Sequence, residues 1–453
     1  MHHVAKFWPL SDVHLGRSTP PKTFTAPSLY RLAVEAFVRS FSDNPRCNGY
    51  RVAIGQLPVT VRLDVLCEMC DCPSLIEAQL HILSDPLLFS DLIRYRSSAL
   101  TPLVRCVQWL QSAKESLPAE LCTRYRRLVD TKPHTDDHKR LDYRCGLRIG
   151  TFLTQTGWTV EAIAILLITR HQTRLGSPDE LAVLRQLLRA QTLTGKLKDA
   201  SKTYQRMEKV KRWILLLPET ETGRLHDLFA SVWHSFALFH FESRSFRESF
   251  ECGEHALSWL GERSPSRLVV DVYRLLARAS VGQRLFESAE VLLEQAIARA
   301  MRDFGRTSAP YAETLEELAM FLLARSQVGE SVDVYAEAQH IYMQLYGSRN
   351  LLLSLAQGDL AYGLCLQAYV TGRRDRALQH VEQAIGNYNR ILPKYHRLFV
   401  QVRRLRVTID MLKFYTNGDT TDTPTFNYRE VYEPLSVEDI SSIRSVQQVP
   451  KAW

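Results

Sequence analysis

The sequence predicts an all-α fold in which antiparallel helix pairs stack into a solenoid, and two observations support this prediction. The first is a template of small and apolar residues that occurs twice, with an offset of 42 residues. The second is that no stretch shows the sustained apolar/polar alternation of a half-buried strand. The two copies of the template are Tyr273, Leu276, Ala277, Ser280, Ala289, Leu293 and Ala296, then Leu315, Leu318, Ala319, Leu322, Ser331, Tyr335 and Ala338.

These intervals are those of a tetratricopeptide helix pair, in which small residues let two helices approach closely and larger ones fill the space between pairs. Weaker copies of the template precede and follow the central two. We therefore expect an array of about six repeats over residues 136–415. The repeats are anchored at Ala162, Ala200, Ser249, Ala289, Ser331 and Ala377.

The segments around the array have a different character. Residues 1–27 are rich in Pro, Ser and Thr and are expected to form a flexible tail, whereas residues 28–135 are helical in pattern but do not fit the template. Residues 416–453 turn polar, and we expect a disordered tail there. This polar end leaves two alternatives, either a partner that covers the last repeat or an incomplete chain.

Composition limits the classes of partner. The 453 residues carry 57 basic and 49 acidic residues, a formal charge of +8, and the basic excess gathers in clusters such as 196–212. We interpret these clusters as solvated helix faces and expect no nucleic-acid binding, because no recognised nucleic-acid motif accompanies them. The odd count of nine Cys favours reduced thiols. No stretch resembles a membrane span or a secretory signal, so we expect a cytoplasmic, and also nuclear, protein.

Motifs for bond chemistry are missing from the sequence. It contains no Gly-rich phosphate loop, no His-Glu-x-x-His and no Gly-x-Ser-x-Gly, so we expect a non-enzymatic protein without a cofactor. The one metal-like cluster is Cys67, Cys70 and Cys72, for which His81 is the nearest downstream histidine. Buried thiols are favoured over a zinc site, because a fourth ligand with matched spacing is lacking.

Several stretches carry a family resemblance over roughly residues 25–400. They include GTFLTQTGWTVEA, PYAETLEELAMFLL and HVEQAIGNYNRILP, and they resemble the amyloid protein-binding protein 2 family. The resemblance implies repeats similar to those of kinesin light chains. It also implies a substrate receptor of a cullin-two RING ubiquitin ligase, which binds C-terminal degrons that contain Arg and Gly. Links to the tail of the amyloid precursor protein and to microtubule-based transport are implied as well.

The resemblance assigns roles to two N-terminal helices. The helix that starts at Ser28 matches the family's elongin-binding box, whose apolar stripe inserts into the groove of elongin C. A second helix matches the downstream cullin box. Plain core packing is the alternative for both. The expected elongin-binding residues are Ser28, Leu29, Ala33 and Phe37, and the expected cullin-binding residues are Leu57, Pro58 and Val61.

The first helices of the central repeats are expected to bind the client peptide. In the template register, Glu313 and Glu316 project toward the concave groove, and Asp271 occupies the equivalent place one repeat earlier. We expect a locally acidic cluster that holds a peptide Arg, with an ordinary solvated acidic face as the alternative.

Two functional classes follow from these observations. One is a ligase receptor that binds elongin B/C, the cullin with its RING subunit, and client peptides. The other is a scaffold or cargo adaptor without a ligase, bound to microtubules or peripherally to membranes. Self-association is left open. Elongin binding discriminates between the two classes.

Overall fold

The computed structural model of the chain describes residues 28–95, 100–113, 116–130, 142–216, 225–346, 351–391 and 397–416. Over these residues it consists of α-helices, two short 3-10 turns and their connections, without a strand. The all-α prediction is confirmed. The expected tails, residues 1–27 and 416–453, lie outside the described residues, apart from Thr416, which is the last residue of a helix.

The N-terminal helices form a compact region that packs against the first helix pair of the array. Helices α6 and α8 contact α9 and α10, and one apolar core runs from Val34 to Ala190. The helices are α2 (Leu29–Asp43), α3 (Asn48–Gln56), α4 (Val59–Glu68), α5 (Ile76–Leu83), α6 (Pro86–Tyr95), α7 (Leu100–Ser112) and α8 (Leu117–Asp130), with 3-10 turns η2 (Met69–Asp71) and η3 (Pro73–Leu75) between α4 and α5.

The rest of the described chain consists of consecutive antiparallel helix pairs and a last helix, α22 (Arg397–Thr416). All six expected anchors lie on the second helices of the pairs, and none of them is exposed to solvent. Small side chains at these points allow the close approach that the template predicts. The pairs are α9 (Tyr143–Gln155) with α10 (Thr159–His171), α11 (Pro178–Leu193) with α12 (Leu197–Leu215), α14 (His226–Glu242) with α15 (Phe246–Ser258), α16 (Ser266–Gly282) with α17 (Phe286–Phe304), α18 (Ala309–Ala324) with α19 (Val328–Tyr346), and α20 (Leu351–Thr371) with α21 (Asp375–Ile391).

Two of the anchors are serines, and each fixes its pair with a hydrogen bond. Ser249 Oγ donates to the carbonyl of Ala237 over 2.8 Å, and Ser331 Oγ donates to the carbonyl of Ala319 over 2.7 Å. The hydroxyl proton is thereby satisfied in the interior, so serine is tolerated where other repeats carry alanine.

The turn inside each pair contains one residue with positive φ, at the same place in every repeat. The residue lies five positions before the anchor, as Gly157 does before Ala162. Glycine suits this left-handed conformation because it has no Cβ, and other residues adopt it at an energetic cost. The six residues are Gly157, Gly195, Arg244, Arg284, Ser326 and Gly372.

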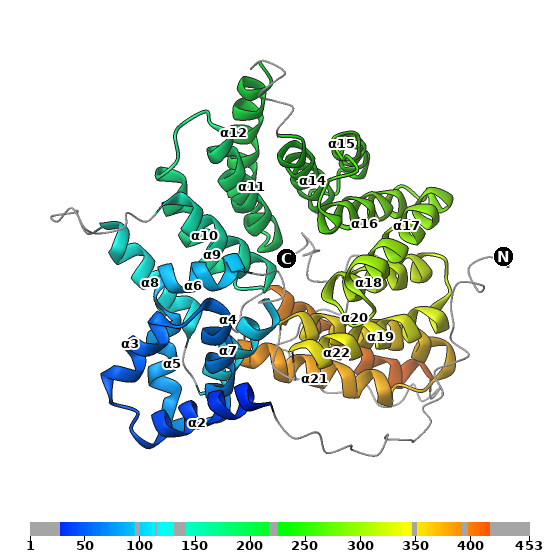
Figure 1. The fold of residues 1–453 in the computed structure, drawn as a ribbon. Helices are drawn as coiled ribbons and strands as arrows, with labels where there is room; N and C mark the ends of the chain where they lie inside the picture. Colours follow the sequence, from blue (N-terminus) through cyan, green and yellow to red (C-terminus); the bar gives the residue numbers. More distant parts are fainter. Residues whose placement is uncertain are drawn as a thin grey trace.

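Figure 1 shows the pairs following one another in an arc, with α11, α16 and α18 on its inner side and α12, α15 and α17 on its outer side. Successive first helices contact each other directly, as α11 does α14, α14 does α16 and α16 does α18. We call the surface formed by the first helices the inner wall. Helix α7 also contacts α19, so the N-terminal region bridges toward the later repeats. None of the described helices combines the length and the apolar character that crossing a bilayer requires.

Candidate functional site

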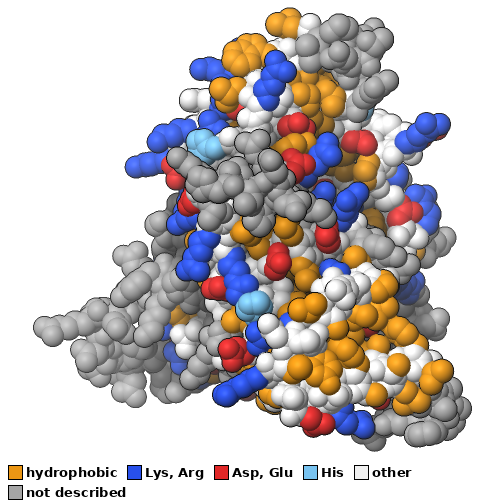
Figure 2. Space-filling model, turned by 60° about the vertical axis from the view of Figure 1, so that its left-hand side comes forward, with side chains coloured by type: hydrophobic (Ala, Val, Ile, Leu, Met, Phe, Trp, Pro, Cys, Tyr) orange, Lys and Arg blue, Asp and Glu red, His pale blue; other side chains and the backbone are white. Residues whose placement is uncertain are grey.

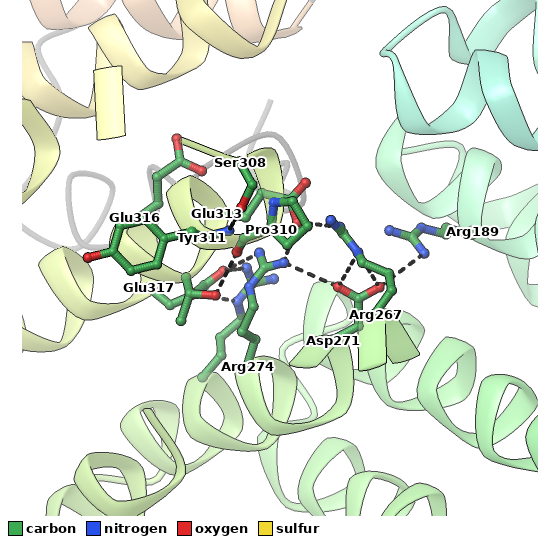
Figure 3. A network of polar contacts seen from close by, with 12 residues as sticks. Arg189, Arg267, Asp271, Arg274, Ser308, Pro310, Tyr311, Glu313, Glu316 and Glu317 are labelled. Carbon is green, nitrogen blue, oxygen red and sulfur yellow. Dashed lines mark hydrogen bonds and ion pairs between the residues drawn. The ribbon is translucent and has the colours of Figure 1, made fainter. Parts of the chain in front are cut away.

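The inner wall carries a network of buried charges that links three of the first helices, α11, α16 and α18 (Figure 3). Arg189 Nη1 of α11 lies 4.0 Å from Asp271 Oδ2 of α16, and Arg267 Nε lies 3.1 Å from Asp271 Oδ1. Arg267 also pairs with Glu313 of α18. Asp271 is 8% exposed, so its charge requires such partners to remain in the interior.

Arg274 lies at the centre of this network and is 1% exposed. Its Nη1 lies 3.3 Å from Asp271 Oδ1, its Nη2 lies 3.4 Å from Glu317 Oε1, and the guanidinium also pairs with Glu313. Arg278 Nε in turn donates to Glu317 Oε2 over 3.0 Å. Arg189, Arg267, Asp271, Arg274, Arg278, Glu313 and Glu317 are called the charged network below.

The arginines keep the carboxylate of Asp271 ionised. Burial acts to raise the pKa of Asp271, but Arg267, Arg189 and Arg274 outweigh it and hold this pKa below its ordinary value. The interior charges of α16 and α18 therefore stabilise one another across the boundary between two repeats.

The expectation of a locally acidic cluster at Asp271 and Glu313 is wrong for these two residues. Both carboxylates already have guanidinium partners from Arg267 and Arg274, which sequence analysis did not include in the site. A peptide Arg would have to compete with arginines of the protein itself. That any of the three predicted acidic residues contacts a peptide stays a prediction.

Glu316 differs from the other two acidic residues. It is 3% exposed, Tyr342 Oη donates to its Oε2 over 3.1 Å, and its Oε1 is buried without a hydrogen-bond partner. Asp359 of α20 is also 3% exposed, and its Oδ2 likewise lacks a partner. Within the described residues, no cationic side chain forms an ion pair with Glu316 or Asp359, which we call the carboxyl pair.

Burial and mutual repulsion disfavour ionisation of the carboxyl pair. Burial raises the pKa of Asp359 to about 8, partly offset by Arg278. Burial, and then the charge of Asp359, raises the pKa of Glu316 well above its ordinary value. Two buried acidic oxygens without a donor are suited to a guanidinium or ammonium group, which would supply both charge and hydrogen bonds.

Sequence analysis missed Asp359 and Arg274, although the repeat offset contained a signal for both. Arg274 lies 42 residues before Glu316, which is the separation of the turn residues Arg284 and Ser326. Asp359 lies 46 residues after Glu313, which is the separation of the turn residues Ser326 and Gly372, so each pair of residues occupies equal positions of successive first helices. Such positions are neighbours when first helices contact directly. Charged residues at equal positions could therefore have been tested as pairs across repeats.

The second candidate site is α2, which begins after Ser28. The hydroxyl of Ser28 accepts a hydrogen bond from the amide of Arg31 over 3.3 Å and so caps the helix. The helix turns Val34, Val38 and Phe41 into the core. Its buried face is therefore different from the predicted stripe.

The predicted stripe of α2 is exposed at its start and packed at its end. Leu29 is 83% exposed and Ala33 is also exposed, whereas Phe37 is half-buried, with its ring centroid 5.5 Å from that of Tyr50. The alternative of plain core packing is wrong for Leu29 and Ala33. Leu32, 46% exposed, adds a further apolar side chain at this end of the helix.

The predicted cullin-binding residues lie at the corner between α3 and α4. Pro58 is exposed, whereas Leu57 and Val61 are half-buried. Arg62 donates from Nη2 to the carbonyl of Leu57 over 2.9 Å and from Nε to that of Ile54 over 3.0 Å, which holds the end of α3. Figure 2 brings the N-terminal helices forward and shows hydrophobic side chains gathered on the lower part of this face.

The cysteines of α4 and η2 pack as thiols. Cys70 Sγ lies 3.7 Å from Cys106 Sγ, and both side chains are buried. Hydrogen bonding to Cys67 and Cys70, together with burial, raises the pKa of Cys106 well above its ordinary value. Among the described residues, neither Cys67, Cys70 and Cys72 with His81 nor any other group of His, Cys, Asp and Glu is arranged to hold a metal ion.

The stacked pairs, the repeated anchors and the charged inner wall define a helical-repeat binding protein of the tetratricopeptide type. Amyloid protein-binding protein 2 of Rattus norvegicus and that of Mus musculus are each 31% identical to this chain over 180 residues, which is 40% of this chain and 31% of the relative. The chain is a divergent relative of that family, and it spans about a third of the length of these curated relatives.

Solved structures give looser matches. One is a Rap protein complexed with Competence and Sporulation Factor, with a TM-score of 0.40 and 10% identity over 78% of this chain and 97% of that one. Another is a signal-transduction ATPase with a tetratricopeptide-repeat sensor from Pyrococcus horikoshii, with a TM-score of 0.41 and 10% identity over 86% of this chain and 63% of that one. No family model matches the chain.

Proposed function

We propose that this protein is the substrate-recognition subunit of a cullin-two RING ubiquitin ligase, and that its inner wall binds client peptides through an Arg side chain. The observation that carries the peptide-binding part is the carboxyl pair, since Glu316 and Asp359 are buried acids without a cationic partner among the described residues. A bound guanidinium would pair with both and be nearly desolvated, which strengthens such hydrogen bonds.

In this proposal the subunit itself performs no bond chemistry. It holds the client while elongin B/C and the cullin with its RING subunit bring the ubiquitin-carrying enzyme. Degrons that contain Arg and Gly fit the wall, because a small Gly lets the peptide backbone approach the helices closely. The location of such a complex would be cytoplasmic and nuclear.

The adaptor contact would be made by the exposed part of α2. Leu29, Leu32 and Ala33 are apolar side chains exposed on one surface helix, as a helix-in-groove contact requires. Leu57, Pro58 and Val61 follow at the next corner of the chain and would face the cullin. Leu29 is the expected anchor, since it is 83% exposed, compared with 46% for Leu32.

The test is a titration of purified elongin B/C against the full chain and its Leu29→Asp variant. We expect binding to weaken by about tenfold or more, because a charge replaces an apolar anchor in a groove. Leu216→Asp is the matched control, since Leu216 is also 83% exposed but lies at the end of α12. Equal affinity of the wild type and Leu29→Asp would reject α2 as the adaptor contact.

The second candidate is a scaffold or cargo adaptor without a ligase. The same carboxyl pair supports it, because client binding at the inner wall does not require elongin. Its expected clients are cytoplasmic tails such as that of the amyloid precursor protein, with transport along microtubules. Absence of elongin B/C and of the cullin from a native pull-down that retains a client would favour this function.

A further inference from the structure

The inner wall has an excess of arginine at the end opposite the carboxyl pair. Arg185 and Arg189 lie four residues apart on α11 and so share one face of the helix. Arg189 has only a 4.0 Å ion pair with Asp271, and Arg185 forms no hydrogen bond or ion pair with the described residues. Asp271 is already shared by Arg267 and Arg274.

The two arginines are half-buried and lack acceptors for part of their guanidinium groups. The Nε atoms of both are buried without an acceptor. Burial, followed by repulsion from Arg189, lowers the pKa of Arg185 to about 10, and burial also lowers the pKa of Arg189. A guanidinium in such a place lacks an anion, which would restore its charge balance and its hydrogen bonds.

A neutral histidine completes this end of the wall. His234 of α14 is 8% exposed, and burial lowers its pKa to about 3, despite the opposing effect of Asp271. The ring is therefore uncharged near neutral pH and can donate one N–H to an anion. Donors from α11 and α14 thus meet on the same wall that carries Glu316 at its other end, and Figure 3 shows Arg189 and Glu316 on opposite sides of the charged network.

We infer that Arg185 and Arg189 form a binding site for a carboxylate of the peptide whose Arg side chain occupies the carboxyl pair. The inference rests on the proposed peptide binding and adds the polarity of the bound peptide. A ligand with a cation at α18 and α20 and an anion at α11 is a peptide with charges of opposite sign, rather than a phosphate or a nucleotide. The carboxylate comes from the C-terminus or from an Asp or Glu side chain, and a planar guanidinium binds either in bidentate fashion.

The test is retention of random-sequence hexapeptides on the immobilised full chain, with peptide acids and peptide amides mixed in equal amounts. Mass spectrometry of the retained peptides gives two independent readouts. The ratio of acids to amides, with the content of Asp and Glu in the retained amides, reports on the arginine end. The content of Arg reports on the carboxyl pair.

We expect the wild type to prefer peptide acids, or amides rich in Asp and Glu, by about tenfold, and Arg185→Gln to lose this preference while it still enriches Arg. Arg185→Lys should retain part of the preference, since it keeps the charge but not the fork. Arg247→Gln is the matched control, because Arg247 of α15 has an 83% exposed side chain. Arg185→Gln breaks no ion pair of the described residues, and an unchanged melting temperature checks its fold.

The outcomes separate the two proposals. Preferential retention of peptide acids over amides supports the inference and identifies the C-terminus as the source of the carboxylate. Enrichment of Asp and Glu in the retained amides supports it as well and identifies a side chain as the source. Arg enrichment without either preference overturns the inference and leaves the proposed function standing. A carboxylate preference without Arg enrichment rejects the carboxyl pair as the Arg site, and retention of no peptide overturns both.

Discussion

The two halves of the inner wall treat buried charge in opposite ways. Between α16 and α18, Asp271, Glu313 and Glu317 are each paired with at least one arginine. Between α18 and α20, Glu316 and Asp359 are equally buried but have no such partner among the described residues. The first half satisfies its charges within the protein and so stabilises the stack. In the second half, the carboxyl groups of Glu316 and Asp359 must stay protonated or bind a cation from outside the protein, and this requirement is typical of a binding site.

The largest expected effect comes from removing the central arginine of the paired half. Arg274→Ala leaves three buried carboxylates short of a partner, and breaking such a network typically costs about 3–5 kcal/mol of unfolding free energy. Urea denaturation followed by circular dichroism measures this loss. Arg247→Ala removes an exposed arginine on α15 and should change stability little. Similar midpoints for both variants would contradict the structural role of the network.

Removing a charge from the unpaired half should raise the stability of the protein, whereas Arg274→Ala in the paired half should lower it. Because the pKa of Asp359 is raised in the fold, its stabilising contribution is complete below its unfolded pKa near 3.8 and is lost as the pH rises toward about 8. Asp359→Asn removes the ionisation, so at pH 9 we expect the variant to be more stable than the wild type by about 1–3 kcal/mol. Melting temperatures between pH 5 and pH 9 measure this difference.

For Asp359→Asn, the difference should be small at pH 5 and should grow as the pH rises. A wild-type stability that increases from pH 5 to pH 9 relative to Asp359→Asn would show that Asp359 has an ionic partner in the fold.

The contact within a helix pair gives a smaller effect. Ala289 of α17 is fully buried where two helices meet, so Ala289→Leu should overpack the contact and cost about 2 kcal/mol. Ala298→Leu is the matched control on the exposed face of the same helix. Chemical denaturation of both variants measures the difference. Equal stability would mean that the register of this repeat is not as described.

The smallest effect is expected at the turns. Arg284 has φ 63°, a conformation that Gly195 adopts at the same place in an earlier repeat. Arg284→Gly should therefore stabilise the protein by about 0.5–1 kcal/mol, since relief of strain exceeds the added freedom of the unfolded chain. Gly195→Ala should destabilise it. Thermal melts that rank these two variants in the reverse order would contradict the shared turn geometry.

The repeats were predictable from the sequence because their determinants are local. Ala289 and Ser331 occupy equal template positions, and the small side chain at this position by itself predicts that a neighbouring helix packs closely against it. The charged network was not predictable in the same way, since Glu313 and Glu317 of α18 depend on arginines of α16, one repeat earlier. These residues look like an acidic cluster in the sequence, but in the folded protein arginine side chains neutralise their charge.

The spacing of apolar residues in α2 also did not predict which of these side chains are exposed to solvent. Leu29, Val34 and Phe37 are all apolar, and helical spacing alone does not tell which face meets the core. The position of α4 and η3 decides this, because it leaves Leu29 outside while Val34 is buried. Tertiary packing, rather than periodicity, therefore separates the candidate adaptor residues from the core.

The most direct test of the account compares two labelled peptides, one with Arg-x-x-Gly and one in which Gln replaces the Arg. Fluorescence anisotropy titrations use the full chain and its Glu316→Gln, Asp359→Asn double variant at about 0.15 M salt, where screening is near 8 Å. We predict that the wild type binds the Arg peptide at least tenfold more tightly than the Gln peptide, and that the double variant binds the two alike. A preference for Arg that persists in the double variant would contradict the assignment of the carboxyl pair as the peptide-binding site.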